Sequence, residues 1–184
     1  MLFVSCSQTK MYENINGYIT FKPFLFSAKI GTLLANSTCF RDMKGDTFIE
    51  ERKGDLFTAP PSMAQGHFIS AYGNTTGSGA MQFGGHREIE KCHPTVGSVV
   101  VLEEYGRLIY NLVTKEKFYD QTMLTSLNKC LREMRDHMRQ NHVTELALPR
   151  MGCGFDGVMW ADVYAILEDV FRYTGIKIVV FTLK

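Results

Sequence analysis

Residues 146–157 read Leu146-Ala147-Leu148-Pro149-Arg150-Met151-Gly152-Cys153-Gly154-Phe155-Asp156-Gly157, and a helical pattern begins directly afterwards, near Trp160. An apolar strand therefore enters a glycine-spaced turn that opens a helix. This arrangement gathers free backbone N–H groups and the positive end of a helix dipole around one small volume, which is typical of a phosphate-binding site. Asp156 has two interpretations here. It is an N-cap of the following helix, or a carboxylate placed among phosphate-binding amides because a reaction needs it.

Strand and helix signals alternate on both sides of this stretch. Extended segments are predicted at 47–52, 66–70, 98–102, 108–114, 145–148 and 176–183. One helix carries an apolar face made of Leu124, Leu127, Leu131, Met134 and Met138. A second helix runs from Val163 through Phe171 and is expected to stop at Gly175, a natural C′ residue. The alternation predicts an α/β domain with a mixed sheet covered by helices, in which both glycine-rich segments lie at the carboxyl ends of strands.

The chain is expected to divide near residue 46. Residues 1–46 show little sustained periodicity, apart from a possible short strand at 18–21, and form an N-terminal extension whose role the sequence does not indicate. Residues 47–184 form the α/β domain. A chain of 184 residues is long enough for one substantial hydrophobic core.

Composition excludes several classes of protein. The net charge of +1 gives no general attraction to nucleic acid or anionic membranes, and no apolar run approaches the ~18 residues of a membrane span. The five cysteines are scattered without a CxxC spacing, which argues against a disulfide framework or a metal site and favours an intracellular, reducing compartment. Basic residues on the first helix, at positions 129, 132, 135 and 139, alternate with acidic ones. They are better explained as a solvated face than as a nucleic-acid site.

Taken together, the motifs resemble those of macrodomains, and most closely those of the terminal ADP-ribose protein glycohydrolase class. The resemblance covers roughly residues 48–184. It rests on the order of six segments: Lys53-Gly54-Asp55-Leu56-Phe57, His67-Phe68-Ile69-Ser70, Gly77-Ser78-Gly79-Ala80, Phe83-Gly84-Gly85, Leu112-Val113-Thr114-Lys115 and Pro149-Arg150-Met151-Gly152-Cys153-Gly154-Phe155-Asp156. It implies a three-layer α/β/α fold, binding of ADP-ribose, and action on mono-ADP-ribosylated proteins without a cofactor or metal.

The resemblance also implies a role for individual residues. Asp55 accepts a hydrogen bond from the adenine amino group, the backbone of Leu56 holds the base, and Phe181 and Leu183 lie near it. Ser70 lines the phosphate or ribose region, and Thr114 lies beside the ligand. Two loops embrace the diphosphate, and their residues are Gly77, Ser78, Gly79, Ala80, Arg150, Met151, Gly152, Cys153, Gly154 and Phe155. From the residues alone, Asp55 is equally a turn residue, Ser70 a strand-end serine, and Phe181 and Leu183 core residues.

Lys115 and Asp156 fall on the two catalytic positions of this class. The implied mechanism is attack of the lysine amine on the anomeric carbon of the distal ribose, which expels a glutamate or aspartate side chain of the modified protein. Asp156 then handles protons while the lysine adduct is resolved to free ADP-ribose. The amine must be neutral to attack. Cys153, at a helix N-terminus, is an alternative nucleophile, although buried cysteines are mostly structural.

One departure from the family pattern affects the catalytic expectation. Only Ala80-Met81-Gln82 separates Gly79 from Phe83, where the family has a longer helical stretch. A reader that binds ADP-ribose without hydrolysing it is therefore the alternative function. We expect a monomer in the nucleus or cytoplasm.

Overall fold

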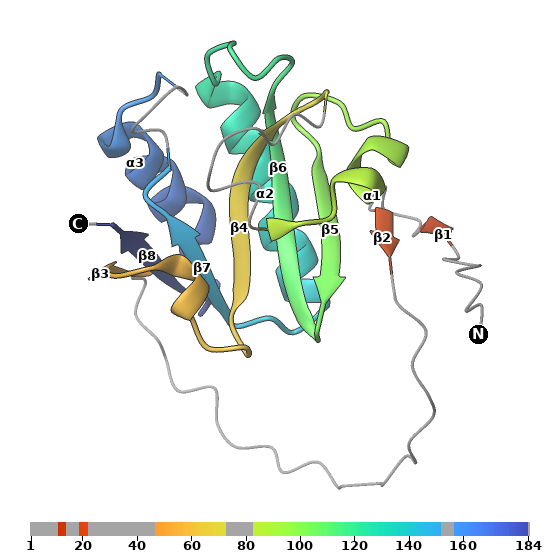
Figure 1. Cartoon of the computed structure of the whole chain (residues 1–184). Helices are drawn as coiled ribbons and strands as arrows, with labels where there is room; N and C mark the ends of the chain where they lie inside the picture. The colour runs from red at the N-terminus through yellow and green to blue at the C-terminus, as the bar shows by residue number, and fades with distance from the viewer. Residues whose placement is uncertain (1–10, 14–18, 22–46, 73–82, 152–156, 184) are drawn as a thin grey trace, which may run out of the picture.

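The computed structural model describes residues 11–13, 19–21, 47–72, 83–151 and 157–183. Its centre is an eight-stranded sheet with the strand order β1-β2-β5-β6-β4-β7-β8-β3 (Figure 1). The strands are β1 (Met11–Glu13), β2 (Ile19–Phe21), β3 (Phe48–Lys53), β4 (Ala64–Ser70), β5 (Val99–Glu104), β6 (Arg107–Lys115), β7 (Glu145–Pro149) and β8 (Lys177–Thr182). All six predicted extended segments after residue 46 are strands, with boundaries shifted by a few residues at most.

The sheet is mixed, as predicted. Strands β6, β4, β7, β8 and β3 run parallel to one another, whereas β5 is antiparallel to β6. The parallel strands are joined through helices, which is the usual way to return a chain to the same edge of a sheet. The short strands β1 and β2 come from residues before the predicted boundary and extend the same sheet, with β2 parallel to β5.

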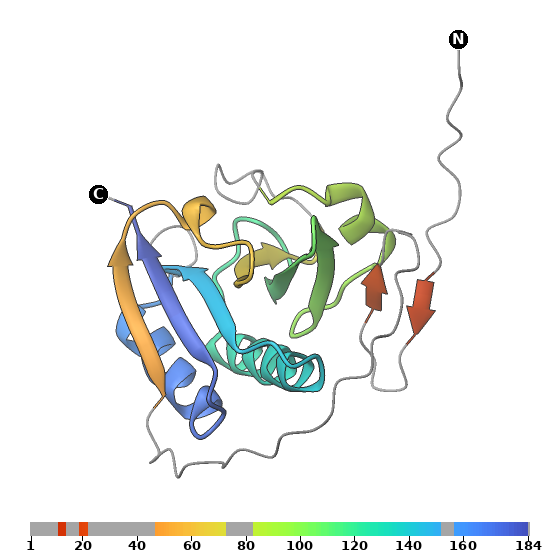
Figure 2. The same cartoon turned by 90° about the horizontal axis from the view of Figure 1, so that it is seen from below.

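Helices cover both faces of the sheet, which gives the expected three layers. Helices α2 (Leu124–Gln140) and α3 (Trp160–Phe171) lie on one face, and α1 (His86–Lys91) and the 3₁₀ helix η1 (Leu56–Thr58) lie on the other (Figure 2). Each face has its own apolar core. The α2 and α3 side includes Tyr110, Leu148 and Phe171, and the opposite side includes Ile89 and Phe181.

The apolar face of α2 explains how this helix is held. Leu127, Leu131, Met134 and Met138 are fully buried, as their spacing of three and four residues predicts. Leu124, the first residue of the helix, is 40% exposed. The opposite face is solvated, and Arg132 pairs with Asp169 of α3 at 3.0 Å.

Two helix boundaries were not predicted from the sequence. Helix α3 ends at Phe171 rather than at Gly175, because Arg172 leaves the helical conformation and Tyr173 already has a φ of 60°. Helix α1 has too few residues for a periodic signal. It begins after Gly85, whose φ of 70° and closeness to Leu102 leave no room for a side chain.

Candidate functional site

The carboxyl ends of the parallel strands define one edge of the molecule. After β4 the chain passes towards β5 on one side, and after β7 it passes through α3 to β8 on the other side. This is a switch point of the topology, where α/β sheets place their ligands. Strands β4 and β7 pair only at Ala64–Leu146 and Gln65–Ala147, so β4 continues to Ser70 without β7 beside it. The two glycine-rich motifs follow β4 and β7 in the sequence, so both strands end at this part of the edge.

Ser70 and Lys115 meet at this edge. They are register partners at the ends of β4 and β6, directly after an irregularity in the pairing, and the Ala71 N–H donates to the Lys115 carbonyl at 2.9 Å. The irregularity leaves Thr114 as an extra residue, and bulges of this kind re-aim side chains beside active sites. Lys115 is only 9% exposed and Ser70 only 1%. Within the described residues, the Ser70 hydroxyl has no hydrogen-bond partner.

Thr114 has a structural contact as well as its predicted place beside the ligand. Its side chain is fully buried, and its hydroxyl lies 3.1 Å from the hydroxyl of Thr122, which is also buried. This hydrogen bond ties the end of β6 to the residues that precede α2. Thr114 therefore fixes the backbone that carries Lys115.

Asp55 opens η1 at the carboxyl end of β3. One of its carboxylate oxygens accepts a hydrogen bond from the Phe57 N–H at 3.0 Å, so the residue is a turn cap, and its side chain is exposed. The buried Leu56 follows, and its carbonyl accepts from the Gln65 side chain and from the Ala59 N–H, both at 3.0 Å. Gln65 thus fastens η1 to the middle of the sheet.

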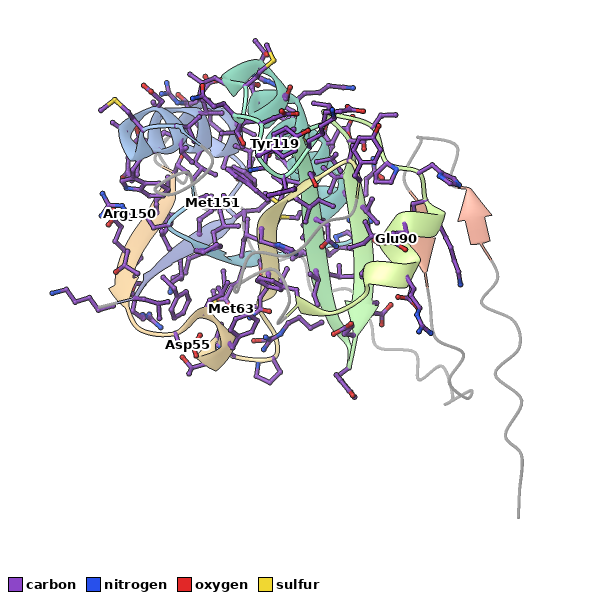
Figure 3. All side chains as sticks on the ribbon, turned by 45° about the horizontal axis from the view of Figure 1, so that its top comes forward. Asp55, Met63, Glu90, Tyr119, Arg150 and Met151 are labelled. Atoms are coloured by element: carbon purple, nitrogen blue, oxygen red, sulfur yellow. The ribbon has the colours of Figure 1, made fainter. Side chains whose placement is uncertain are left out.

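Four other predicted residues lie at the ends of β7 and β8 or just after them: Arg150, Met151, Phe181 and Leu183. Phe181 is buried and its carbonyl accepts from the Arg150 N–H at 3.0 Å, whereas Leu183 is 81% exposed. Arg150 is exposed beside the ring of Trp160, and Met151 is buried. Figure 3 shows Met151 between Asp55 and Tyr119.

Some predicted site residues lie outside the described residues. They are Gly77, Ser78, Gly79, Ala80, Gly152, Cys153, Gly154, Phe155 and Asp156. The residues on either side of the second loop are described, however. Met151 and Gly157 bound the second loop, and a side chain at Gly157 would approach Gln121 to 3.1 Å. Gly157, which precedes α3, and Gln121, which precedes α2, are therefore neighbours.

Sequence reasoning missed a buried polar group below the site. The ring of His67 in β4 lies 2.7 Å from the Asn111 side-chain oxygen in β6, and Asn111 also donates to the Val100 carbonyl at 3.1 Å. The same imidazole stacks on Phe83 at 3.9 Å between ring centroids. Gln65 and His67 alternate with apolar residues in β4, and this pattern of polar residues on a buried strand was the available signal. Phe83 is the first described residue after the first glycine-rich motif, and this stack holds it against β4.

Burial disfavours the thiolate form of both described cysteines. Burial raises the pKa of the Cys130 thiol to about 12, and burial together with Glu88 raises the pKa of Cys92. In the described ranges, no cluster of histidine, cysteine, aspartate or glutamate side chains has the composition of a metal site. None of the helices in this part of the chain has the length and apolar character of a membrane span.

The chain is similar in sequence to known proteins. No protein-family model matches the chain. It is 39% identical over 135 residues to the human protein ADP-ribose glycohydrolase OARD1, which covers 71% of this chain and 89% of the human one. The bovine protein of the same name is equally similar.

Solved structures agree on the fold. The macrodomain of DarG from Mycobacterium tuberculosis superposes with a TM-score of 0.67 at 21% identity, over 74% of this chain and 97% of that one. DarTG from Thermosipho africanus, solved in complex with ADP-ribose, gives a TM-score of 0.61 at 14% identity, over 72% of this chain and 41% of that one. At these identities the likeness is one of fold.

Proposed function

This chain belongs to the macrodomain family, in the class of the ADP-ribose glycohydrolases, and on that premise we propose that it removes mono-ADP-ribose from glutamate and aspartate side chains of proteins, with Lys115 as the nucleophile. The observation that carries the proposal is the position of Lys115. It ends a central parallel strand at the ligand-binding edge, in register with Ser70, which is itself almost fully buried.

The arrangement suits an extended ligand with an adenine at one end. The exposed carboxylate of Asp55 has two oxygens, of which one caps η1, so the other can accept from an adenine amino group. The Leu56 carbonyl already accepts two hydrogen bonds, so its N–H is the backbone group that contacts the base. Phe181 lies near the end of the neighbouring strand β8, and Leu183 follows that strand. From here the ligand runs past Arg150 and Met151 towards Ser70 and Lys115.

The proposed reaction takes place at the distal ribose and uses Lys115 and Asp156. The neutral amine of Lys115 forms a bond to the anomeric carbon of the distal ribose, while the bond from that carbon to the carboxylate oxygen breaks and its electron pair leaves with the oxygen. Asp156 takes the proton from the nitrogen. Water then attacks the same carbon while the carbon–nitrogen bond breaks and its electron pair stays on the nitrogen, which takes back the proton held by Asp156. Asp156 accepts the proton that the water loses and passes it to solvent, so that ADP-ribose and the free amine result. Ser70 donates its hydroxyl to a ribose or phosphate oxygen, which would satisfy a group that is otherwise costly to bury.

The test is release of ADP-ribose from a protein modified on glutamate. The wild-type chain should liberate free ADP-ribose and the unmodified carboxylate, detected by chromatography and by mass spectrometry of the protein. Binding of ADP-ribose without any release would instead identify a reader, the alternative that the short Ala80-Met81-Gln82 stretch favours. We also propose an intracellular, reducing compartment, which the free thiols of Cys92 and Cys130 support.

A further inference from the structure

A group of exposed apolar side chains surrounds the strand end that carries Lys115. It consists of Tyr72, Phe118, Tyr119 and Met123, which are 63%, 49%, 63% and 64% exposed. We call it the aromatic rim. A soluble domain scatters single exposed apolar residues over its surface, but here four of them follow two adjacent strand ends, β4 and β6. The function proposed above uses none of them.

The backbone places the rim directly beyond the site. The Tyr72 N–H donates to the Glu116 carbonyl at 3.4 Å, so Tyr72 lies one step past the Ser70–Lys115 pair. The rings of Phe118 and Tyr119 contact each other edge to face, with centroids 5.1 Å apart. Met123 is the N-cap of α2 and follows Thr122, whose hydroxyl is bonded to Thr114. The rim is thus anchored to the same strand end as Lys115.

The rim is also preorganised. Asp120 closes the turn that carries the two rings, because its carboxylate accepts from the Lys117 N–H at 2.9 Å and its own N–H donates to the Lys117 carbonyl at 3.1 Å. The ammonium group of Lys117 lies 5.7 Å from the centre of the Tyr119 ring. Aromatic and methionine side chains held in this way are enriched at protein interfaces and among the residues that dominate binding energy.

The direction of the ligand identifies what covers this surface. Asp55 and Tyr119 lie far apart in Figure 3, with Met151 between them. If the adenine is at Asp55 and the reacting ribose at Lys115, the group attached to that ribose must extend beyond Lys115, where the rim lies. We infer that the aromatic rim binds the polypeptide on either side of the modified glutamate or aspartate, so that the enzyme recognises the protein part of its substrate as well as the ADP-ribose. This inference rests on the proposed function.

A polypeptide is favoured over a nucleic acid by the charges of the rim. Aromatic side chains also stack on bases, but sites for single strands combine them with a positive groove along the backbone. Here Lys115 and Lys117 are offset by Glu116 and Asp120 on the same loop. The mixture suits the alternating polar and apolar groups of a peptide.

The experiment measures binding in the Lys115→Ala background, so that the substrate is not consumed. Three probes are titrated: free ADP-ribose, a peptide mono-ADP-ribosylated on glutamate, and a single-stranded oligonucleotide carrying ADP-ribose. We expect the peptide to bind about tenfold more tightly than ADP-ribose, the scale of one or two interface hot spots. Phe118→Asn together with Tyr119→Asn should remove this gain and leave the affinity for free ADP-ribose unchanged.

The matched control removes two exposed rings elsewhere. Tyr105 is fully exposed at the opposite edge and Tyr173 is 76% exposed after α3, and both have a positive φ, which asparagine tolerates. Tyr105→Asn with Tyr173→Asn should keep the tenfold gain. Thermal melting confirms that each variant is folded, and Tyr119→Asn alone serves if the double variant is not.

Three outcomes would overturn the inference: equal binding of peptide and ADP-ribose, a gain that survives loss of the rim, or a rim-dependent gain for the oligonucleotide instead. The proposed hydrolysis is assayed separately on the chain with Lys115 intact. If the peptide binds more tightly than ADP-ribose through the rim but no hydrolysis occurs, the inference is retained and the lysine mechanism is rejected. If hydrolysis occurs but the peptide binds no more tightly than ADP-ribose, the mechanism is retained and the inference is rejected.

Discussion

Ser70 and Lys115 are direct partners across β4 and β6, and the Ala71 N–H that follows Ser70 donates to the Lys115 carbonyl at 2.9 Å. The pair joins a buried hydroxyl to a nearly buried amine at the edge where the ligand is expected. The Ser70 hydroxyl has no partner among the described residues, and Lys115 is the last residue of its strand. Substitution at the two positions should therefore affect function more than stability.

Ser70→Ala tests the hydroxyl. Since its Oγ has no partner among the described residues, its removal should leave the melting temperature unchanged or slightly higher. The affinity for ADP-ribose should fall about fivefold, which corresponds to one lost hydrogen bond of about 1 kcal/mol. Calorimetry and thermal melting measure the two effects. Ser98→Ala is the control, because its hydroxyl bonds only a local carbonyl. A lower melting temperature with unchanged affinity would show that Ser70 serves the fold.

Lys115→Ala tests the nucleophile. Hydrolysis should be lost while ADP-ribose still binds, because a nucleophile contributes mainly to the transition state. The measurement is release of ADP-ribose, with affinity determined by calorimetry on the same preparation. Lys91→Ala, an exposed lysine on α1, should behave like the wild type. Mass spectrometry of the wild type should also trap an ADP-ribose adduct on the peptide that contains Lys115. Full activity of Lys115→Ala would reject the mechanism.

The sequence predicted elements that depend on local patterns. Helix α2 followed from the spacing of Leu127, Leu131, Met134 and Met138, which are all buried, and β7 followed from a short apolar run before a glycine turn. Contacts between distant residues were not predictable in this way. His67 and Asn111 are 44 residues apart, and only the pairing of β4 with β6 brings them together.

The candidate site shows the same division. Residue spacing alone assigned Lys115 to a solvated strand tip, and only the family resemblance gave it a role. The structure shows it nearly buried, at a strand end that is paired with β4 and followed by a segment tied back through Thr114 and Thr122. Thr122 was not a candidate, since a threonine before a helix has many uses. Thr122 holds the end of β6 only through the hydrogen bond between its hydroxyl and that of Thr114, and the sequence does not reveal this contact.

Ligand choice can be tested at the adenine end. ADP-ribose should bind at least tenfold more tightly than AMP, because only the larger ligand reaches the diphosphate loops. Asp55→Asn should keep the cap of η1 but oppose the adenine amino group with its own amide, so both affinities should fall by a similar factor of about five. Calorimetry with both ligands gives the comparison. Equal affinity for ADP-ribose and AMP in the wild type would mean that the loops do not bind a diphosphate.

Stability should depend on pH through His137. This residue is buried in α2, its ring nitrogen lies 3.0 Å from the Tyr110 hydroxyl, and burial lowers its pKa below the ordinary 6.5. The folded state keeps the imidazole neutral, whereas in the unfolded state the ring takes up a proton below about pH 6.5. The contribution of His137 to the free energy of unfolding is therefore complete above about pH 6.5 and is lost as the pH falls below that value. Urea unfolding between pH 8 and pH 5.5 measures it. In His137→Gln, the free energy of unfolding should change less with pH over this range than in the wild type. An equal change in both proteins would contradict the assignment to His137.

Asp156, which lies outside the described residues, has two interpretations that make different predictions. As a helix cap, its replacement by alanine should cost about 1 kcal/mol of unfolding free energy and have little effect on turnover. As the group that accepts the lysine proton, it should reduce turnover by about 100-fold or more when replaced, since positioned proton transfer contributes on that scale.

Asp156→Asn separates the two, because asparagine caps a helix but cannot accept the proton. We expect this variant to melt at the wild-type temperature, to bind ADP-ribose as tightly or more tightly, and to lose hydrolysis. Tighter binding is reasonable because a negative charge beside the diphosphate has been removed. If Asp156→Asn retained its rate while Asp156→Ala melted early, Asp156 would be a cap, and the proton from Lys115 would need another acceptor.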